Sequence, residues 1–225
     1  MILPKKWNFT ISPDDILRGQ GADPQIVRER KPSLQKAAER AFAEGLGLIH
    51  PAAWTAEIVV LEHRHERIRL VGGAALTGSL VTHQFSGAQR VVAAICTIGS
   101  ELETATAHLF SEDPLYALAL DGLGNAAVES LAQQVCGYIA EQAVIEGLQA
   151  SSPLSPGNSA WPVEVGQPQI FSLMDPSRAG ITLTSGGMMI PKKTVSFVVG
   201  LGPEMSQTNM CSVCSLNETC RYRHA

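Results

Sequence analysis

The sequence predicts a single-core protein of mixed helices and strands, with one helix much longer than the rest. Apolar residues recur at helical spacing after Ser33, and the run QRVVAAIC at 89–96 is typical of a buried strand. A third signal is an apolar stripe that continues from Asp113-Pro114 to about Gly147, roughly 34 residues or about 50 Å of helix. With 45% apolar and 17% charged residues in 225, the chain can bury a core and is not disordered.

The N-terminal third reads as three helices. Ser12 is suited to cap a helix that Pro13 opens and Gly19 stops, and Asp23-Pro24 opens a second short helix in the same way. A third helix begins near Ser33, with one apolar face, and ends between 45 and 51.

The next segment is typical of strands. Residues 56–61 and 68–71 flank a charged stretch and are expected to form a hairpin or an exposed strand continuation. After the buried strand at 89–96, Ser100 and Glu103 have the spacing of a capping box, which predicts a helix to about Phe110.

The long helix contains glycines that suggest a break or kink. Gly122 and Gly124 lie in its interior, where each glycine costs about 1 kcal/mol. Serine, proline and glycine dominate 149–168, which predicts a long loop or linker.

The rest of the chain is expected to hold a short helix at 170–174 and strands at 180–184 and 194–200, followed by a polar tail. We therefore divide the chain into three parts. These are an N-terminal helical segment (1–30), an α+β domain (31–202) and a cysteine-rich tail (203–225).

Charge and hydropathy exclude several classes of protein. Lys+Arg 17 against Asp+Glu 21 gives a net charge of −4 without a basic run, so we expect no nucleic-acid partner. No stretch of about 18 apolar residues is present and the start lacks a secretory leader, so we expect a cytoplasmic protein with no membrane association.

Three cysteines near the end form the most specific local pattern. Cys211, Cys214 and Cys220 have a Cys-x2-Cys-x5-Cys spacing, and His224 follows four residues later. Thiolates suit an iron–sulfur cluster or zinc, and a Cys3His zinc site can be drawn with these four residues. The spacing does not separate the two metals, and idle thiols are the alternative to both.

The remaining candidates favour structural roles. Cys96 and Cys136 lie in the buried strand and the long helix, where cysteine is usually a small core residue. His63 and His65 are expected on a solvated strand face rather than at a metal. The glycine-rich stretches lack the phosphate-loop Lys-Ser/Thr, and no Gly-x-Ser-x-Gly or His-Glu-x-x-His motif supports a hydrolase.

Several stretches, taken in order, resemble a known family. They are Thr97-Ile98-Gly99, Leu120-Asp121-Gly122 with 126–129, Ser155-Pro156-Gly157, Trp161-Pro162, 169–175, 180–184 and 188–196. Together they resemble the activation (reactivation) domain of cobalamin-dependent methionine synthase. The closer likeness is to its small stand-alone relatives found beside corrinoid proteins, over about residues 30–202.

The resemblance implies an α+β domain with a twisted antiparallel sheet flanked by helices. It also implies S-adenosylmethionine in a groove lined by the Pro-Gly loop. Carried onto this chain, the cofactor-binding residues would be Ser155, Pro156, Gly157, Asn158, Ser185, Met188 and Met189. In the family, one electron returns an oxidised corrinoid to cobalt(I), and S-adenosylmethionine then methylates it. Cobalamin would therefore reach this chain only through a partner protein.

Three positions depart from the family pattern. Pro153 stands where the family has arginine, Asn158 where it has tyrosine and Ser185 where it has glutamate. The fold framework is kept while polar and aromatic ligand contacts are lost, which indicates an altered ligand site.

These observations predict an accessory protein of a corrinoid methyltransferase system, which assists reductive activation or S-adenosylmethionine-dependent remethylation of the cobalt. Its partners would be a corrinoid-binding protein or methyltransferase and an electron donor such as a ferredoxin or flavodoxin, with an iron–sulfur centre on the tail as a further electron source. The alternatives are a non-catalytic metal-binding interaction module with a degenerate groove, and a methyltransferase-system subunit that binds a different small molecule.

Overall fold

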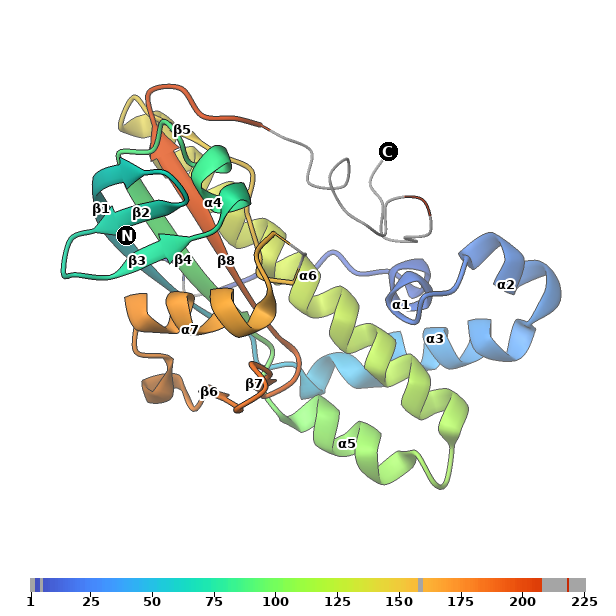
Figure 1. Ribbon diagram of the computed structural model, residues 1–225. Helices are drawn as coiled ribbons and strands as arrows, with labels where there is room; N and C mark the ends of the chain where they lie inside the picture. Colours follow the sequence, from blue (N-terminus) through green and yellow to red (C-terminus); the bar gives the residue numbers. More distant parts are fainter. Residues whose placement is uncertain (1–2, 5, 158–159, 208–217, 219–225) are drawn as a thin grey trace.

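The computed structural model describes residues 3–4, 6–157, 160–207 and 218, and these form the expected α+β fold (Figure 1). In the described residues, six strands build one antiparallel sheet in the order β3-β2-β1-β4-β8-β5, and two more form a separate hairpin, β6-β7. The strands are β1 (Ala52–Arg64), β2 (Arg67–Leu70), β3 (Ala75–Thr77), β4 (Arg90–Thr97), β5 (Gln149–Ala150), β6 (Thr182–Leu183), β7 (Met189–Ile190) and β8 (Thr194–Gly202). The helices are α1 (Pro13–Gly19), α2 (Pro24–Arg30), α3 (Pro32–Gly45), α4 (Ser79–Gln84), α5 (Glu101–Leu109), α6 (Pro114–Ile145) and α7 (Val163–Leu173), with the 3-10 turns η1 (Leu46–Leu48) and η2 (Pro176–Ala179).

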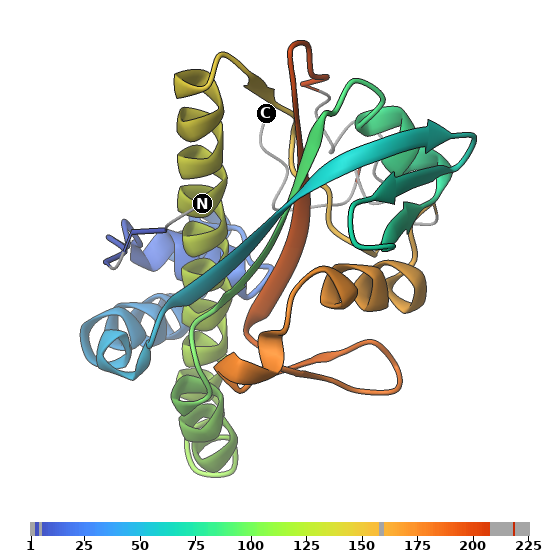
Figure 2. The same ribbon diagram turned by 90° about the vertical axis from the view of Figure 1, so that its left-hand side faces the viewer.

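The long strand β1 gives the sheet its curl. Its first part pairs with β4 and its last part with β2, with an irregularity in register between Val60 and Glu62 (Figure 2). The expected hairpin of 56–61 with 68–71 is confirmed, although β1 extends beyond the expected strand at both ends.

Helices cover both faces of the sheet. α6 lies on one face, where Leu131, Val135 and Ile139 pack against β4 and β8 (Figure 2). On the opposite face, α4 and α7 pack against the alternate residues of the same strands. α1, α3 and α5 surround the first half of α6 and form a further cluster with it.

The long helix is confirmed, but the expected break in it is wrong. α6 is one continuous helix of 32 residues. Its interior glycines serve close packing instead: a Cβ on Gly122 would meet α1, and one on Gly124 would meet the side chains of Leu102 and Lys193. Each glycine lowers the stability of the helix, but the neighbouring elements occupy the space that a side chain would need.

The expected capping box at the start of α5 is also wrong. Ser100 has helical backbone angles (φ −104°, ψ −11°) and makes no capping hydrogen bond with its side chain. The Glu103 carboxylate instead accepts a hydrogen bond from the backbone N–H of Lys192, at 2.8 Å. A long-range contact therefore replaces the local one.

The segment 149–168 contains more regular structure than expected. α7 begins at Val163 and continues through Pro168, so the helix expected at 170–174 is only its last part. The composition of this segment, rich in serine, proline and glycine, does not indicate a helix, because proline normally breaks one.

Candidate functional site

The Ser155-Pro156-Gly157 stretch forms a closed loop in front of α7. The loop is anchored on the sheet, where Leu154 and Val198 of β8 exchange two backbone hydrogen bonds of 2.9 Å. It closes where the N–H of Gly157 donates to the carbonyl of Trp161, also at 2.9 Å. Gly157 has φ +133°, a conformation that favours glycine.

Gly166 of α7 provides the surface on which this loop rests. A Cβ built on Gly166 would lie 2.6 Å from the ring of Pro156 and 2.8 Å from the indole of Trp161. Only glycine leaves room for both rings, and the Trp161 side chain is fully buried there. The loop therefore packs tightly against the helix.

A buried hydrogen bond fixes α7 on the sheet. The Ser196 hydroxyl of β8 donates to the Gln167 carboxamide at 2.8 Å, and both side chains are buried. Gln167 lies outside every family-like stretch and Ser196 is the last residue of 188–196. Neither was predicted as a site residue, because their pairing depends on the fold.

The second predicted stretch is the turn of the β6-β7 hairpin. Thr184 closes it by three hydrogen bonds: its N–H donates to Met188, its carbonyl accepts from Gly187, and its hydroxyl accepts from the N–H of Met188 at 3.0 Å. Met188 is exposed whereas Met189 is buried, so only the first is accessible. Ser185 is exposed at the turn.

The loop and the hairpin turn meet at the first residue of α7. A Cβ on Gly157 would lie 3.8 Å from one methyl group of Val163, and a Cβ on Gly187 would lie 2.8 Å from the other. The structure thus brings together two stretches that are almost thirty residues apart in the sequence, here termed the loop arm (155–157) and the hairpin arm (185–189).

The other predicted site residues fall outside this junction. Asn158 and the predicted metal ligands Cys211, Cys214, Cys220 and His224 lie outside the described residues. In the part of the chain that is described, no three His, Cys, Asp or Glu residues are grouped as metal ligands would be.

Two further family-like stretches form a structural network. The Lys193 ammonium lies 2.7 Å from both the Asp121 carboxylate and the Asn125 carbonyl oxygen of α6. Asn125 in turn donates to the carbonyl of Gly19, and Thr97 bonds to Thr194. These contacts join the start of β8 to α6, α1 and β4.

The two described cysteines have the expected core character. Burial raises the pKa of the Cys96 thiol strongly, and it raises the pKa of Cys136 to about 12. Both thiols therefore stay protonated at neutral pH, which fits a core role rather than that of a nucleophile. His63 is exposed and contacts the carbonyl of Ala88 at 3.0 Å rather than a second ligand.

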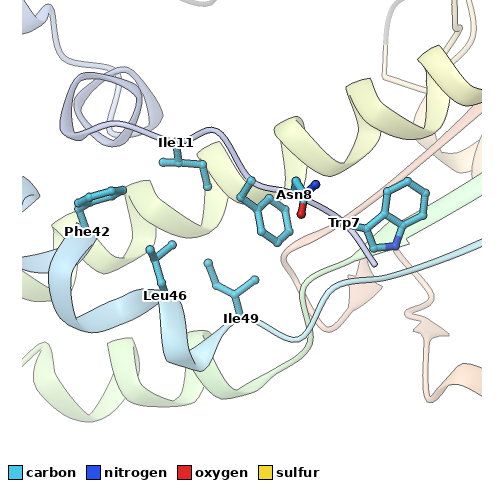
Figure 3. Close-up of a pocket in the computed structure, with 7 residues that line it drawn as sticks. Trp7, Asn8, Ile11, Phe42, Leu46 and Ile49 are labelled. Carbon is cyan, nitrogen blue, oxygen red and sulfur yellow. The ribbon is translucent and has the colours of Figure 1, made fainter. Parts of the chain in front are cut away.

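A separate apolar groove lies between the N-terminal segment and α3. It has a volume of about 370 Å³, and Figure 3 shows Ile11, Phe42, Leu46 and Ile49 directed toward a common space. Asn8 is its one polar lining residue among those described, and no predicted site residue lines it. The groove offers apolar contact but no acid, base or metal ligand.

Comparison with solved structures identifies the architecture. The crystal structure of the MetH reactivation domain bound to AdoHcy superposes with a TM-score of 0.62, covering 82% of this chain and 71% of that chain at 14% sequence identity. This chain has the fold of the MetH reactivation domain.

The fold expected from the resemblance is therefore confirmed. No protein-family model matches the chain, and no curated protein matches it. Within the described residues, none of the helices of this reactivation-domain fold has both the length and the apolar character that crossing a membrane requires.

Proposed function

We propose that this chain is an accessory protein of a corrinoid methyltransferase system and binds S-adenosylmethionine between the loop arm and the hairpin arm. The observation that carries the proposal is the junction at Val163, where both family-like stretches meet. The fold supports it, since the structurally similar MetH reactivation domain was crystallised with AdoHcy. The residues that would line the ligand are Ser155, Pro156, Gly157, Asn158, Ser185 and Met188. Met189 is buried, so it would support the hairpin arm from inside the protein.

The exposed apolar side chains beside the junction would meet the partner. Val165 of α7, Met188 and Ile190 are 42%, 57% and 47% exposed. Apolar side chains in such number around a candidate site favour contact with another surface. In this proposal they would face the corrin of a cobalamin-binding protein or methyltransferase. The chain would hold the methyl donor above the cobalt, which is catalysis by positioning.

Calorimetry with S-adenosylmethionine and S-adenosylhomocysteine tests the ligand site. We expect both to bind, and Gly157→Ala to weaken binding because an alanine at φ +133° forces the loop to change shape. Gly21→Ala is the matched control, since Gly21 also has a positive φ but lies after α1. If neither ligand gives a heat of binding, remethylation is removed from the proposal.

The cysteine-rich tail would supply the metal centre. Cys211, Cys214, Cys220 and His224 would hold an iron–sulfur cluster, which would pass on an electron from a ferredoxin or flavodoxin. Anaerobic purification with visible and EPR spectra tests this. A colourless protein with stoichiometric zinc would contradict an electron-transfer role.

A non-catalytic metal-binding interaction module is the second candidate. Its support is that Pro153 and Ser185 are both exposed and uncharged, where the family has an arginine and a glutamate. Stoichiometric zinc together with no ligand binding would favour this reading. If such a protein still bound a corrinoid protein, its role would be docking; if it did not, its role would lie outside the corrinoid system.

A further inference from the structure

One carboxamide, that of Gln169, connects Trp161, the residue that closes the loop, to the edge of the sheet. The Gln169 oxygen accepts from the backbone N–H of Thr77 at 3.1 Å and from the indole N–H of Trp161 at 3.3 Å. The Gln169 nitrogen donates to the Thr77 hydroxyl at 2.5 Å. These hydrogen bonds tie α7, the end of β3 and the last residue of the loop together.

Trp161, held in this way by Gln169, in turn contacts the loop of the proposed ligand site. Its carbonyl receives the Gly157 N–H, and its indole shares with Pro156 the space above Gly166. The neighbouring carbonyl of Ala160 lies 2.9 Å from where a Cβ on Gly78 would stand. The loop is thus held from its closing end as well as from Leu154.

We infer that Gln169 is a positioning residue, which acts through Trp161 to hold the Pro156-Gly157 loop in its binding conformation before any ligand arrives. The affinity part of this inference rests on the proposed function, whereas the effect on the loop does not. Preorganisation of a loop increases affinity because its ordering cost is met in the free protein.

Substitutions at Gln169 separate positioning from mere stability. Gln169→Leu removes all three hydrogen bonds, whereas Gln169→Glu keeps an acceptor for Thr77 and Trp161 and can accept from the Thr77 hydroxyl. Gln167→Leu is the matched control on the same helix, since it removes the bond to Ser196 but none to Trp161.

The first readout requires no ligand. The chain has three tryptophans, and a variant with Trp7→Phe and Trp54→Phe keeps only Trp161. NMR on this variant then measures hydrogen exchange of the Trp161 indole N–H and of the Gly157 amide. We expect both to exchange at least about tenfold faster in Gln169→Leu, and at near wild-type rates in Gln169→Glu and Gln167→Leu. Equal protection in Gln169→Leu and wild type would overturn the inference.

The second readout is the dissociation constant for S-adenosylhomocysteine. We expect Gln169→Leu to weaken binding about five- to tenfold and Gln167→Leu to leave it within twofold, even where both lower the melting temperature similarly. Equal weakening by both variants would show a general stability effect and contradict positioning. If the wild type does not bind, the proposed function fails while the exchange readout still decides the inference.

Should Gln169→Leu fail to fold, Trp161→Phe removes the same indole bond from its other end and keeps an aromatic ring. We expect it to accelerate Gly157 exchange as well. Unchanged Gly157 exchange in a folded Trp161→Phe chain would contradict the inference.

Discussion

Gly19 of α1 and Gly122 of α6 touch backbone to backbone: a Cβ on Gly19 would lie 2.3 Å from the carbonyl oxygen of Gly122. In the opposite direction, a Cβ on Gly122 would lie 2.5 Å from the carbonyl of Ile16. Helices approach this closely only where neither residue carries a side chain. This contact sets the distance at which the N-terminal helix packs on α6.

We expect Gly122→Ala to lower the free energy of unfolding by about 1–3 kcal/mol, because overpacking outweighs alanine's better helix propensity. Gly137→Ala is the control in the same helix, since nothing lies within 4 Å of its Cβ position. It should raise stability by about 1 kcal/mol. Urea denaturation measures both, and equal effects would contradict the close-packing explanation.

The buried thiols predict a loss of stability in alkali. The unfolded chain ionises a thiol at about pH 8.5, whereas the folded chain keeps Cys136 protonated up to its raised pKa of about 12. The contribution is therefore complete below pH ~8.5 and falls by about 1.4 kcal/mol for each further pH unit. Denaturation curves of wild type and Cys136→Ala should diverge in slope above that pH, and parallel curves would contradict the prediction.

The Lys193 network predicts unequal effects at two neighbouring lysines. The Lys193 side chain is only 13% exposed and bonds to Asp121 and Asn125, so we expect Lys193→Met to cost about 1–3 kcal/mol. Lys192 is exposed, and its backbone bond to Glu103 survives substitution, so Lys192→Met should change stability by less than about 0.5 kcal/mol. Thermal denaturation compares them; a comparable loss from both would exclude the network as the cause.

Adding the charges that the resembled family carries at positions 153 and 185 should strengthen the proposed binding of S-adenosylmethionine. Pro153→Arg would offer a cation to the carboxylate of S-adenosylmethionine. Ser185→Glu would offer a charged acceptor to the N–H and O–H donors of the same ligand. We expect the double variant to bind about tenfold more tightly by calorimetry, which is 1.4 kcal/mol. Ser172→Glu, an exposed position on α7 away from both arms, controls for added charge. Unchanged affinity in the double variant would indicate that positions 153 and 185 do not contact the ligand.

Local chemistry made much of the fold predictable. Asp113 caps α6 through the N–H of Tyr116, and Ser12 caps α1 in a reciprocal pair with Asp15. Each of these signals lies within four residues of its effect. The buried strand at 89–96 was predictable for a different reason, since β4 is covered on both faces and needs an uninterrupted apolar run.

Long-range contacts account for what sequence reasoning missed. Ser100 and Glu103 have the spacing of a cap, yet the Glu103 carboxylate accepts a hydrogen bond from the backbone N–H of Lys192, 89 residues further along the chain. Pro168 and the glycines conceal α7, whose stability comes from Gln167, Gln169 and the packing of Trp161. The resemblance indicated both arms of the candidate site, but their meeting at Val163 is a property of the tertiary structure.

The length of α6 has a mechanical consequence. Its first half belongs to the helical cluster with α1, α3 and α5, and its second half belongs to the cluster on the sheet. If either cluster unfolds, apolar side chains of α6 that pack in that cluster become exposed to water. The helical end and the sheet should therefore melt in one cooperative transition, and free energy gained by docking a partner at one end helps to keep the other end folded.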